Sequence, residues 1–155
     1  GKASNTGGEL IAHWKADKTL KLNASLNAFR IRRDPANVTL LFPYVRIVTL
    51  SPSSDFTWDG KLGVEAALGK STKMQLNGVY YAARDIAQGS QAARSALDLS
   101  LSRTFAKDRI KASLSATDIF NSFGSKTTVN GVGFDALYEN YYETQAVMLS
   151  VEFKI

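Results

Sequence analysis

One segment of this chain has residue types and spacing close to those of a phosphate-binding loop. Residues 63–71 read GVEAALGKS, and such loops cradle phosphate with backbone amides between two glycines. Here five residues separate the glycines where the motif needs four, and the Gly-Lys-Ser falls between two alternating segments with no helix after it. We therefore interpret residues 69–72 as a hairpin turn.

A lone histidine and scattered carboxylates are the other candidates for chemistry. His13 is the only histidine, and its near neighbours Lys15 and Asp17 are same-face residues of one strand, which form neither a triad nor a zinc ligand set. Four acids of the expected long loops lack the spacing of a calcium site: Asp55, Asp59, Asp85 and Asp135. We therefore expect no enzymatic activity, no metal and no cofactor.

Composition removes further classes of function. The chain has 155 residues, no cysteine and a net charge of +5. Without cysteine there is no disulfide framework, zinc finger or thiol catalysis. The basic residues are dispersed and form no stripe with aromatic residues between them, so we expect no nucleic-acid partner. No apolar run is long enough for a transmembrane helix.

The elements that must position any site are strands, because apolar and polar residues alternate from end to end. The alternation predicts seven strands, at about residues 9–17, 20–30, 57–68, 73–82, 96–103, 109–118 and 145–155. The first eight residues, GKASNTGG, resemble a loop interior. Tight polar turns near residues 17, 70 and 107 alternate with long connections. This asymmetry is typical of outer-membrane barrels, whose short turns are periplasmic.

The two faces predicted by this alternation suit a membrane and a wet lumen. Leu and Ala dominate one face, and Ser, Asn, Lys and Asp the other, so we expect the first to contact lipid. Six charged residues are expected to face the lumen, where they neutralise one another or line a substrate path: Lys21, Glu65, Asp98, Lys111, Glu152 and Lys154. Aromatic residues are expected in two belts, with Trp14, Phe105 and Phe153 near the short turns and Phe29, Trp58, Tyr80 and Phe120 near the long loops.

The predicted fold class is therefore all-β, with antiparallel up-and-down strands of a transmembrane barrel. About seven to eight strands are expected, because residues 38–50 could extend the flanking strands or form an extra one. An odd count does not suit a complete bacterial barrel. We interpret residues 1–155 as the C-terminal part of one larger barrel domain.

Several segments resemble the end of TonB-dependent outer-membrane receptors, within the outer membrane protein β-barrel family. These are Asp118-Ile119-Phe120-Asn121, residues 102–105 (SRTF) with Lys107-Asp108, residues 87–89 (AQG) and Trp58. The final alternation resembles the signal read by the barrel-assembly machinery: Val147, Leu149, Val151, Phe153 and Ile155. The chain departs from the usual pattern in ending on Ile155 where such barrels end on an aromatic residue.

The resemblance implies an outer-membrane transporter that takes up a large or scarce nutrient with energy supplied by TonB. Its implied partners are outer-membrane lipid, the barrel-assembly machinery, upstream barrel strands and a plug domain. Ligand recognition would fall to the loops at residues 32–56, 83–95 and 120–143, and the substrate stays unknown. Two alternatives remain open, namely a small autonomous outer-membrane barrel with a structural or adhesive role and a soluble lipocalin-like barrel.

Overall fold

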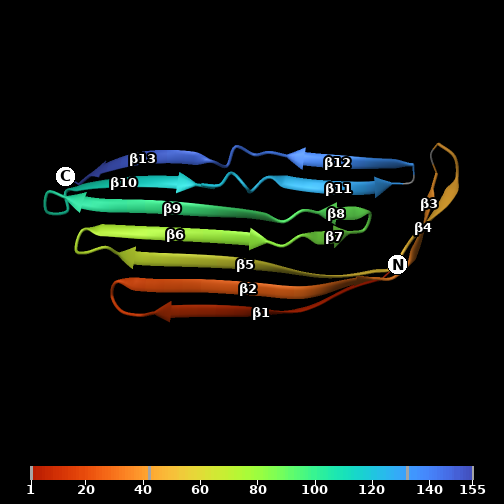
Figure 1. The fold of residues 1–155 in the computed structure, drawn as a ribbon, viewed down its shortest axis with the longest axis horizontal. Helices are drawn as coiled ribbons and strands as arrows, with labels where there is room; N and C mark the ends of the chain where they lie inside the picture. The colour runs from red at the N-terminus through yellow and green to blue at the C-terminus, as the bar shows by residue number, and fades with distance from the viewer. Residues whose placement is uncertain (1, 42, 132, 155) are drawn as a thin grey trace.

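The main element of the structure is one antiparallel sheet of seven long strands. The computed structural model describes residues 2–41, 43–131 and 133–154. The main sheet contains β1 (Ala3–Lys15), β2 (Leu20–Arg33), β5 (Ser53–Ala67), β6 (Thr72–Tyr81), β9 (Arg94–Phe105), β10 (Ile110–Thr117) and β13 (Ala146–Phe153), in that order (Figure 1). This confirms the seven strands predicted from the alternation. Within the described ranges, no helix is long and apolar enough to cross a membrane.

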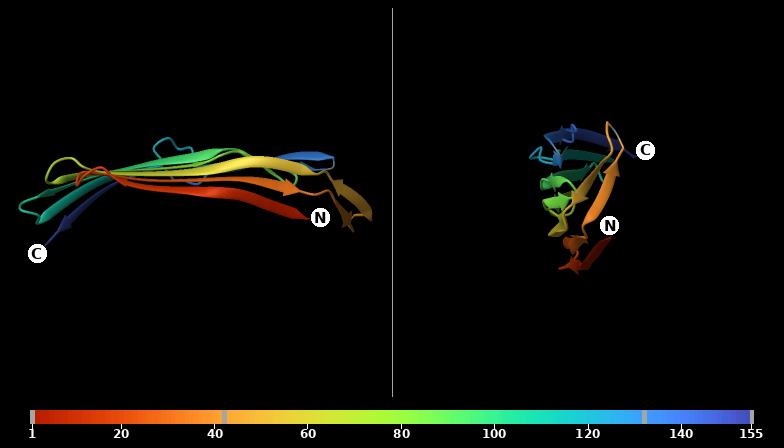
Figure 2. Two further views of the ribbon diagram at one scale, coloured as in Figure 1. Left: turned by 90° about the horizontal axis from the view of Figure 1, so that it is seen from below. Right: turned by 90° about the vertical axis from the view of Figure 1, so that its right-hand side faces the viewer.

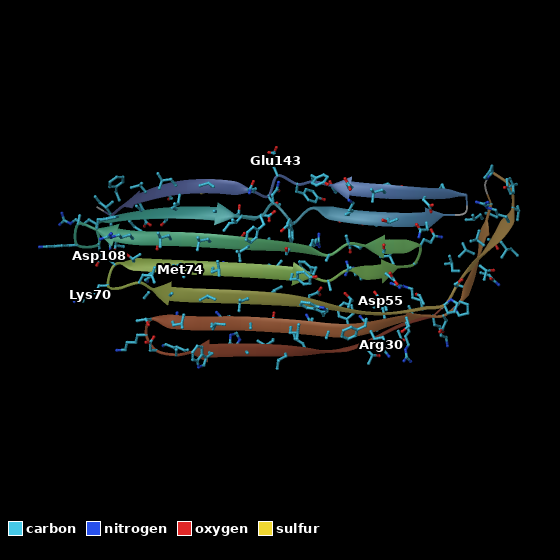
Figure 3. All side chains as sticks on the ribbon, in the orientation of Figure 1. Arg30, Asp55, Lys70, Met74, Asp108 and Glu143 are labelled. Carbon is cyan, nitrogen blue, oxygen red and sulfur yellow. The ribbon has the colours of Figure 1, made fainter. Side chains whose placement is uncertain are left out.

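Three tight turns close one end of the main sheet, as predicted. In the first, the Asp17 carboxylate accepts hydrogen bonds from the Thr19 amide (2.6 Å) and the Leu20 amide (3.0 Å), which fixes the turn. The second bends at Gly69 with φ of 93°. The third places Ala106, Lys107 and Asp108 at positive φ. Lys70 and Asp108 lie at the same end of the sheet (Figure 3).

The long connections at the opposite end are hairpins that extend the sheet. β3 (Ala36–Leu40) and β4 (Arg46–Leu50) pair beyond β2 and β5. β7 (Arg84–Ile86), β8 (Gly89–Gln91), β11 (Ser125–Gly131) and β12 (Phe134–Asn140) form a four-stranded outer sheet in the order β7-β8-β11-β12. This order repeats that of β6, β9, β10 and β13, whose ends lead into it (Figure 1). The long connections thus consist largely of paired strands, and the described residues of 38–50 add no strand to the main sheet.

The hairpin ends meet so closely that one of them requires glycine. Gly89 has φ of 137°, and a Cβ placed there would lie 1.9 Å from the Thr128 carbonyl oxygen. Any side chain at residue 89 would therefore break the pairing of β8 with β11, which joins the two outer hairpins.

The sheet is a single curved layer with no core of its own (Figure 2). No hydrophobic side chain among the described residues is buried. The accessible surface is 11497 Å², whereas a soluble monomer of 16.9 kDa exposes about 7,700 Å². In the part of the chain that the structure describes, the buried residues are the polar Thr57 and Asp118, at 1% and 2% exposure. One face of the sheet therefore requires contact with a non-aqueous environment.

The two edges of the main sheet are β1 and β13. Within the described residues, β1 pairs only with β2, and β13 only with β10. Because every neighbouring pair is antiparallel, the first and seventh strands run in the same direction. Both edges offer a row of unpaired backbone groups, which a membrane does not tolerate.

Candidate functional site

The strand register divides the side chains of the main sheet between two faces. Residues paired across neighbouring strands point to the same side of the sheet. One line of paired residues crosses all seven strands and is entirely apolar: Trp14, Leu22, Val64, Leu76, Leu99, Ala116 and Val147. The next line toward the short turns is apolar too: Leu20, Ala66, Met74, Leu101, Leu114 and Leu149. We call this side the apolar face.

The opposite side, the polar face, carries the charged residues. The line that begins at Lys15 continues through Lys21, Glu65, Gln75, Ser100 and Ser115. Lys21 and Glu65 form an ion pair with Nζ and Oε2 3.1 Å apart. Beside them lies a hollow of about 320 Å³, which Lys73, Ser102 and Lys111 also border.

The six charged residues expected in the lumen are placed as follows. Lys21 and Glu65 neutralise each other across neighbouring strands. Lys111 and Glu152 are register partners on β10 and β13. Asp98 accepts a hydrogen bond from the Asp118 amide at 2.9 Å. Lys154 follows β13, where its amide donates to the Arg109 carbonyl at 2.8 Å.

Aromatic residues at the short-turn end give the inclination of the strands. Trp14 on β1 lies in the same line as Val147 on β13, whereas Phe153 lies six residues nearer the short turns. Six residues span about 20 Å along a strand, and the six spacings between the seven strands add up to about 29 Å across the sheet. If both aromatic residues lie at one membrane boundary, the strands incline by about 35°, which is within the range of membrane barrels.

The belt at the long-loop end needs one correction. Trp58 and Tyr80 stack on the apolar face with ring centroids 4.8 Å apart, and Phe56 is 59% exposed beside them. Phe120 is also exposed, at 70%. Phe29, however, is paired with Gly7 and Thr57 and lies on the polar face. The prediction that Phe29 belongs to the aromatic belt was wrong. It considered how far Phe29 lies along its strand, but not that odd-numbered residues of this strand face the polar side.

Asp118 is the centre of a hydrogen-bonded turn after β10. Its carboxylate accepts bonds from the Ser122 amide (3.0 Å), the Phe123 amide (3.3 Å) and the Thr144 hydroxyl (2.5 Å). Asp118 and Asn121 both have positive φ, at 42° and 49°, which aspartate and asparagine tolerate better than most residues. The motif residues 118–121 therefore fix the bend where β10 leaves the main sheet.

The rest of the motif ties this bend to the neighbouring strands. The Ile119 amide donates to the Leu97 carbonyl of β9 at 2.9 Å. The Ile119 carbonyl accepts a bond from Gln145 Nε2, just before β13, at 2.9 Å. Phe120 is exposed and borders a hollow that Tyr80 and Leu97 of the apolar face also line. The four motif residues thus connect the ends of three strands.

The environment of Asp118 lowers the pKa of its carboxyl group. Desolvation by burial raises the pKa, but the hydrogen bonds from Thr144, Ser122 and Phe123 together outweigh it. The charged form is therefore the one that the turn is built around.

A cationic and aromatic cluster lies at the long-loop end of the polar face. The Arg94 guanidinium carbon is 4.9 Å from the ring centroid of Tyr81 and 5.0 Å from that of Phe123. Asp59 pairs with Tyr81 in the next strand. Sequence reasoning missed this cluster, although the parity of Tyr81 and Arg94 around their hairpin placed both on the polar face. Aromatic rings and a guanidinium group placed together in this way are able to bind a ligand.

Two further candidates from the sequence, His13 and Asp55, form hydrogen bonds within the protein. The His13 ring nitrogen Nδ1 is 2.8 Å from Asn23 Oδ1. The Asp55 carboxylate accepts the Asp85 amide at 2.7 Å. Among the described residues, no group of three or more His, Cys, Asp or Glu is placed to hold a metal ion. The phosphate-loop-like segment spans the end of β5 and the second turn, as expected.

The terminal strand follows the expected alternation. Val147, Leu149 and Val151 pair with Ala116, Leu114 and Ala112 on the apolar face. Phe153 ends β13 opposite Ile110, also on this face. Ile155, the last residue of the expected assembly signal, lies outside the described residues.

Comparison with known proteins agrees with these two faces. No curated protein and no solved structure matches the chain. Residues 1–153 match the outer membrane protein beta-barrel family. A curved antiparallel sheet with one largely apolar face, a charged opposite face and no buried hydrophobic side chain among the described residues is what a segment of such a wall requires. On both grounds the chain belongs to the outer membrane protein beta-barrel family and resides in the outer membrane.

Proposed function

We propose that this chain forms part of a TonB-dependent transporter, which takes up a large or scarce nutrient across the outer membrane. The observation that carries the proposal is the line of polar residues that crosses six strands of the polar face, from Lys15 to Ser115, backed by an apolar face that needs lipid. A charged wall of this kind suits an aqueous or plugged lumen. We propose no catalytic role for these residues.

The parallel edges favour a lumen larger than seven strands can enclose. Joining β1 directly to β13 would create a parallel pair in an otherwise antiparallel wall. An antiparallel closure needs an odd number of further strands, from the same polypeptide or from another subunit. Barrels above eight strands enclose space for a channel or a plug.

The long-loop end offers groups for ligand recognition. The cluster of Tyr81, Arg94 and Phe123 lies on the polar face where the main sheet gives way to the outer hairpins. Because the hairpins are paired strands, they hold such groups in defined positions. Sugars, peptides and iron chelates all suit aromatic and guanidinium surfaces.

The resemblance of residues 118–121 and of the terminal alternation supports specific partners. Lipid covers the apolar face, and β13 presents the terminal alternation to the barrel-assembly machinery. A plug domain and TonB supply gating and energy to the complete transporter.

Energy-dependent uptake tests the proposal. Cells with and without the full-length protein are given labelled iron chelates, oligosaccharides and oligopeptides, before and after the inner-membrane potential is dissipated. We expect one class to enter only in cells that hold both the protein and the potential. In the same assay, Arg94→Gln is expected to weaken uptake, whereas Arg103→Gln, on the apolar face at the short-turn end, serves as the matched control.

Uptake that is independent of the potential, or absent for every class, would contradict the proposal. In that case purified full-length protein that carries no plug and binds no TonB would favour the small autonomous barrel. The soluble lipocalin-like alternative is excluded by the outer-membrane family of the chain.

A further inference from the structure

Three arginines at the long-loop end of β2 divide between the two faces. Arg33 lies on the polar side, where its guanidinium donates to Ser53 Oγ (3.4 Å) and to the Asp85 carbonyl (3.2 Å). Arg30 and Arg32 have the opposite parity and lie on the apolar face, in line with Phe56 and Ser54 of β5. Figure 3 shows Arg30 at this end of the sheet. Two guanidinium groups thus point toward the side that contacts lipid.

Neither of these two guanidinium groups has a hydrogen-bond or ion-pair partner among the residues that the structure describes. Within the described residues, the ion pairs are Lys21–Glu65 and Lys126–Glu139, and none involves Arg30 or Arg32. The nearby acids Glu9, Asp55 and Asp59 have the parity of the polar face. Asp34 follows β2 and forms no ion pair with either arginine.

The depth of the pair corresponds to the lipid headgroups. Arg30 is level with Phe56, which belongs to the aromatic belt at the long-loop end. Arg32 lies two residues farther from the membrane centre, about 6 to 7 Å along the strand. Anionic lipid headgroups are found at this level, and long cationic side chains extend toward them.

The surroundings of the pair form a shallow site with hydroxyl groups. Arg32 is paired with Ser4 and Arg30 with Thr6 on β1. A hollow of about 440 Å³ is bordered by these four residues, Ala28 and Phe56. Guanidinium and hydroxyl groups are donors that suit a phosphate, and guanidinium can bind phosphate with two parallel hydrogen bonds.

We propose that Arg30 and Arg32, with Ser4 and Thr6, bind the phosphate of a phosphorylated lipid headgroup in the outer leaflet. The acyl chains of that lipid lie along the apolar face below Phe56. The site anchors the wall at a fixed depth and is separate from the polar face, on which the proposed transport depends.

Native mass spectrometry of the purified full-length protein in detergent tests this inference. The probes are bis-phosphorylated lipid A, the same lipid after enzymatic dephosphorylation, and inorganic phosphate. The double variant Arg30→Gln/Arg32→Gln is compared with Arg33→Gln, which removes a guanidinium at the same height from the opposite face. Heat-modifiable gel mobility confirms that each variant is folded.

We expect the double variant to lower the affinity for bis-phosphorylated lipid at least about tenfold, because two charge-assisted contacts are lost. Arg33→Gln should leave that affinity within about twofold of the wild-type value. The dephosphorylated lipid should bind the wild type as weakly as the phosphorylated lipid binds the double variant. Inorganic phosphate should not displace the lipid.

Three results would overturn the proposal. They are unchanged lipid binding by the folded double variant, equal binding of the phosphorylated and dephosphorylated lipids, and displacement by inorganic phosphate. The last would assign the site to free phosphate. Because uptake is not measured here, failure of the transport proposal leaves the interpretation of this assay intact.

Discussion

A charge placed in the middle of the apolar face should be costly, whereas the same charge one residue away should be tolerated. Leu76 lies on β6, the middle strand of the main sheet, in the apolar line that crosses all seven strands. Its neighbour Gln75 lies on the polar face. Leu76→Arg and Gln75→Arg therefore form a matched pair, equal in charge and nearly equal in depth.

The magnitude follows from the position of Leu76 between the two aromatic belts. Tyr80 of the same strand lies four residues toward the long loops, about 14 Å along the strand. Interpolation between Trp14 and Phe153 places the other belt about 10 Å toward the short turns. Leu76 is thus close to the bilayer midplane, where arginine on the lipid face costs about 2–4 kcal/mol.

Reversible folding of the full-length protein into phospholipid vesicles measures this difference. Denaturant titrations followed by tryptophan fluorescence and gel mobility give the free energy of unfolding. We expect Leu76→Arg to lower it by about 2–4 kcal/mol, and Tyr80→Arg by at most about 1 kcal/mol, because it lies at the interface. Gln75→Arg should change it by about 0.5 kcal/mol or less. If Gln75→Arg were the costly change and Leu76→Arg were neutral, the assignment of the two faces would be reversed.

Three smaller perturbations test the turns and the polar face. Asp118→Asn should lower the free energy of unfolding by about 1–3 kcal/mol at neutral pH. The folded pKa of Asp118 is below the unfolded value, so its carboxylate contributes to the free energy of unfolding above about pH 4. This contribution is lost as the pH falls through the folded pKa. The denaturant midpoints of the variant and the wild type should therefore converge in acid. Gly89→Ala should accelerate hydrogen exchange in β8 and β11, with a strain of about 1–3 kcal/mol, whereas Gly8→Ala, whose Cβ would meet nothing within 4 Å, should not. Lys21→Gln should cost less than about 1 kcal/mol in the vesicle titration, and added salt should reduce that cost, because the pair with Glu65 is half exposed.

The main sheet was predictable because its signal repeats every two residues. Any stretch of five or six residues with one polar and one apolar set is sufficient to assign a strand and its faces. The short turns were equally clear, as at Asp17, where a local side chain caps the backbone. Both features depend on residues close together in the sequence.

The residues at which strands begin and end were less predictable, because they depend on how far the neighbouring strand extends. The strand expected to begin at residue 9 begins at Ala3, since β2 continues to Arg33 and offers a partner for each added residue. Gly7 suggested a loop, yet it lies where β1 approaches Phe29 so closely that a Cβ would be 2.4 Å from the Phe29 Cβ. Glycine here permits contact between strands, which its local preference does not reveal.

The outer hairpins and their anchors were not predictable from local patterns. β7 and β8 have three residues each, too few for a period of two to be visible. The partners of Asp118 are four, five and 26 residues away, and its amide donates to a carboxylate 20 residues before it. The motif predicted that these residues matter, but only the fold shows that they join strand ends.

Thr57 and Asp118, the two buried side chains of the described residues, indicate how the wall separates membrane insertion from the outer hairpins. Thr57 donates a hydrogen bond to the Ala83 carbonyl at the bend between β6 and β7, and Asp118 holds the bend after β10. Because the apolar face has no core, insertion depends on the lipid contacts of its exposed side chains. The hairpins depend instead on their own pairing and on these two anchors. Substitutions in the outer hairpins should therefore alter the surface proposed to face a ligand without a cost in membrane insertion, provided that Thr57 and Asp118 keep their hydrogen bonds.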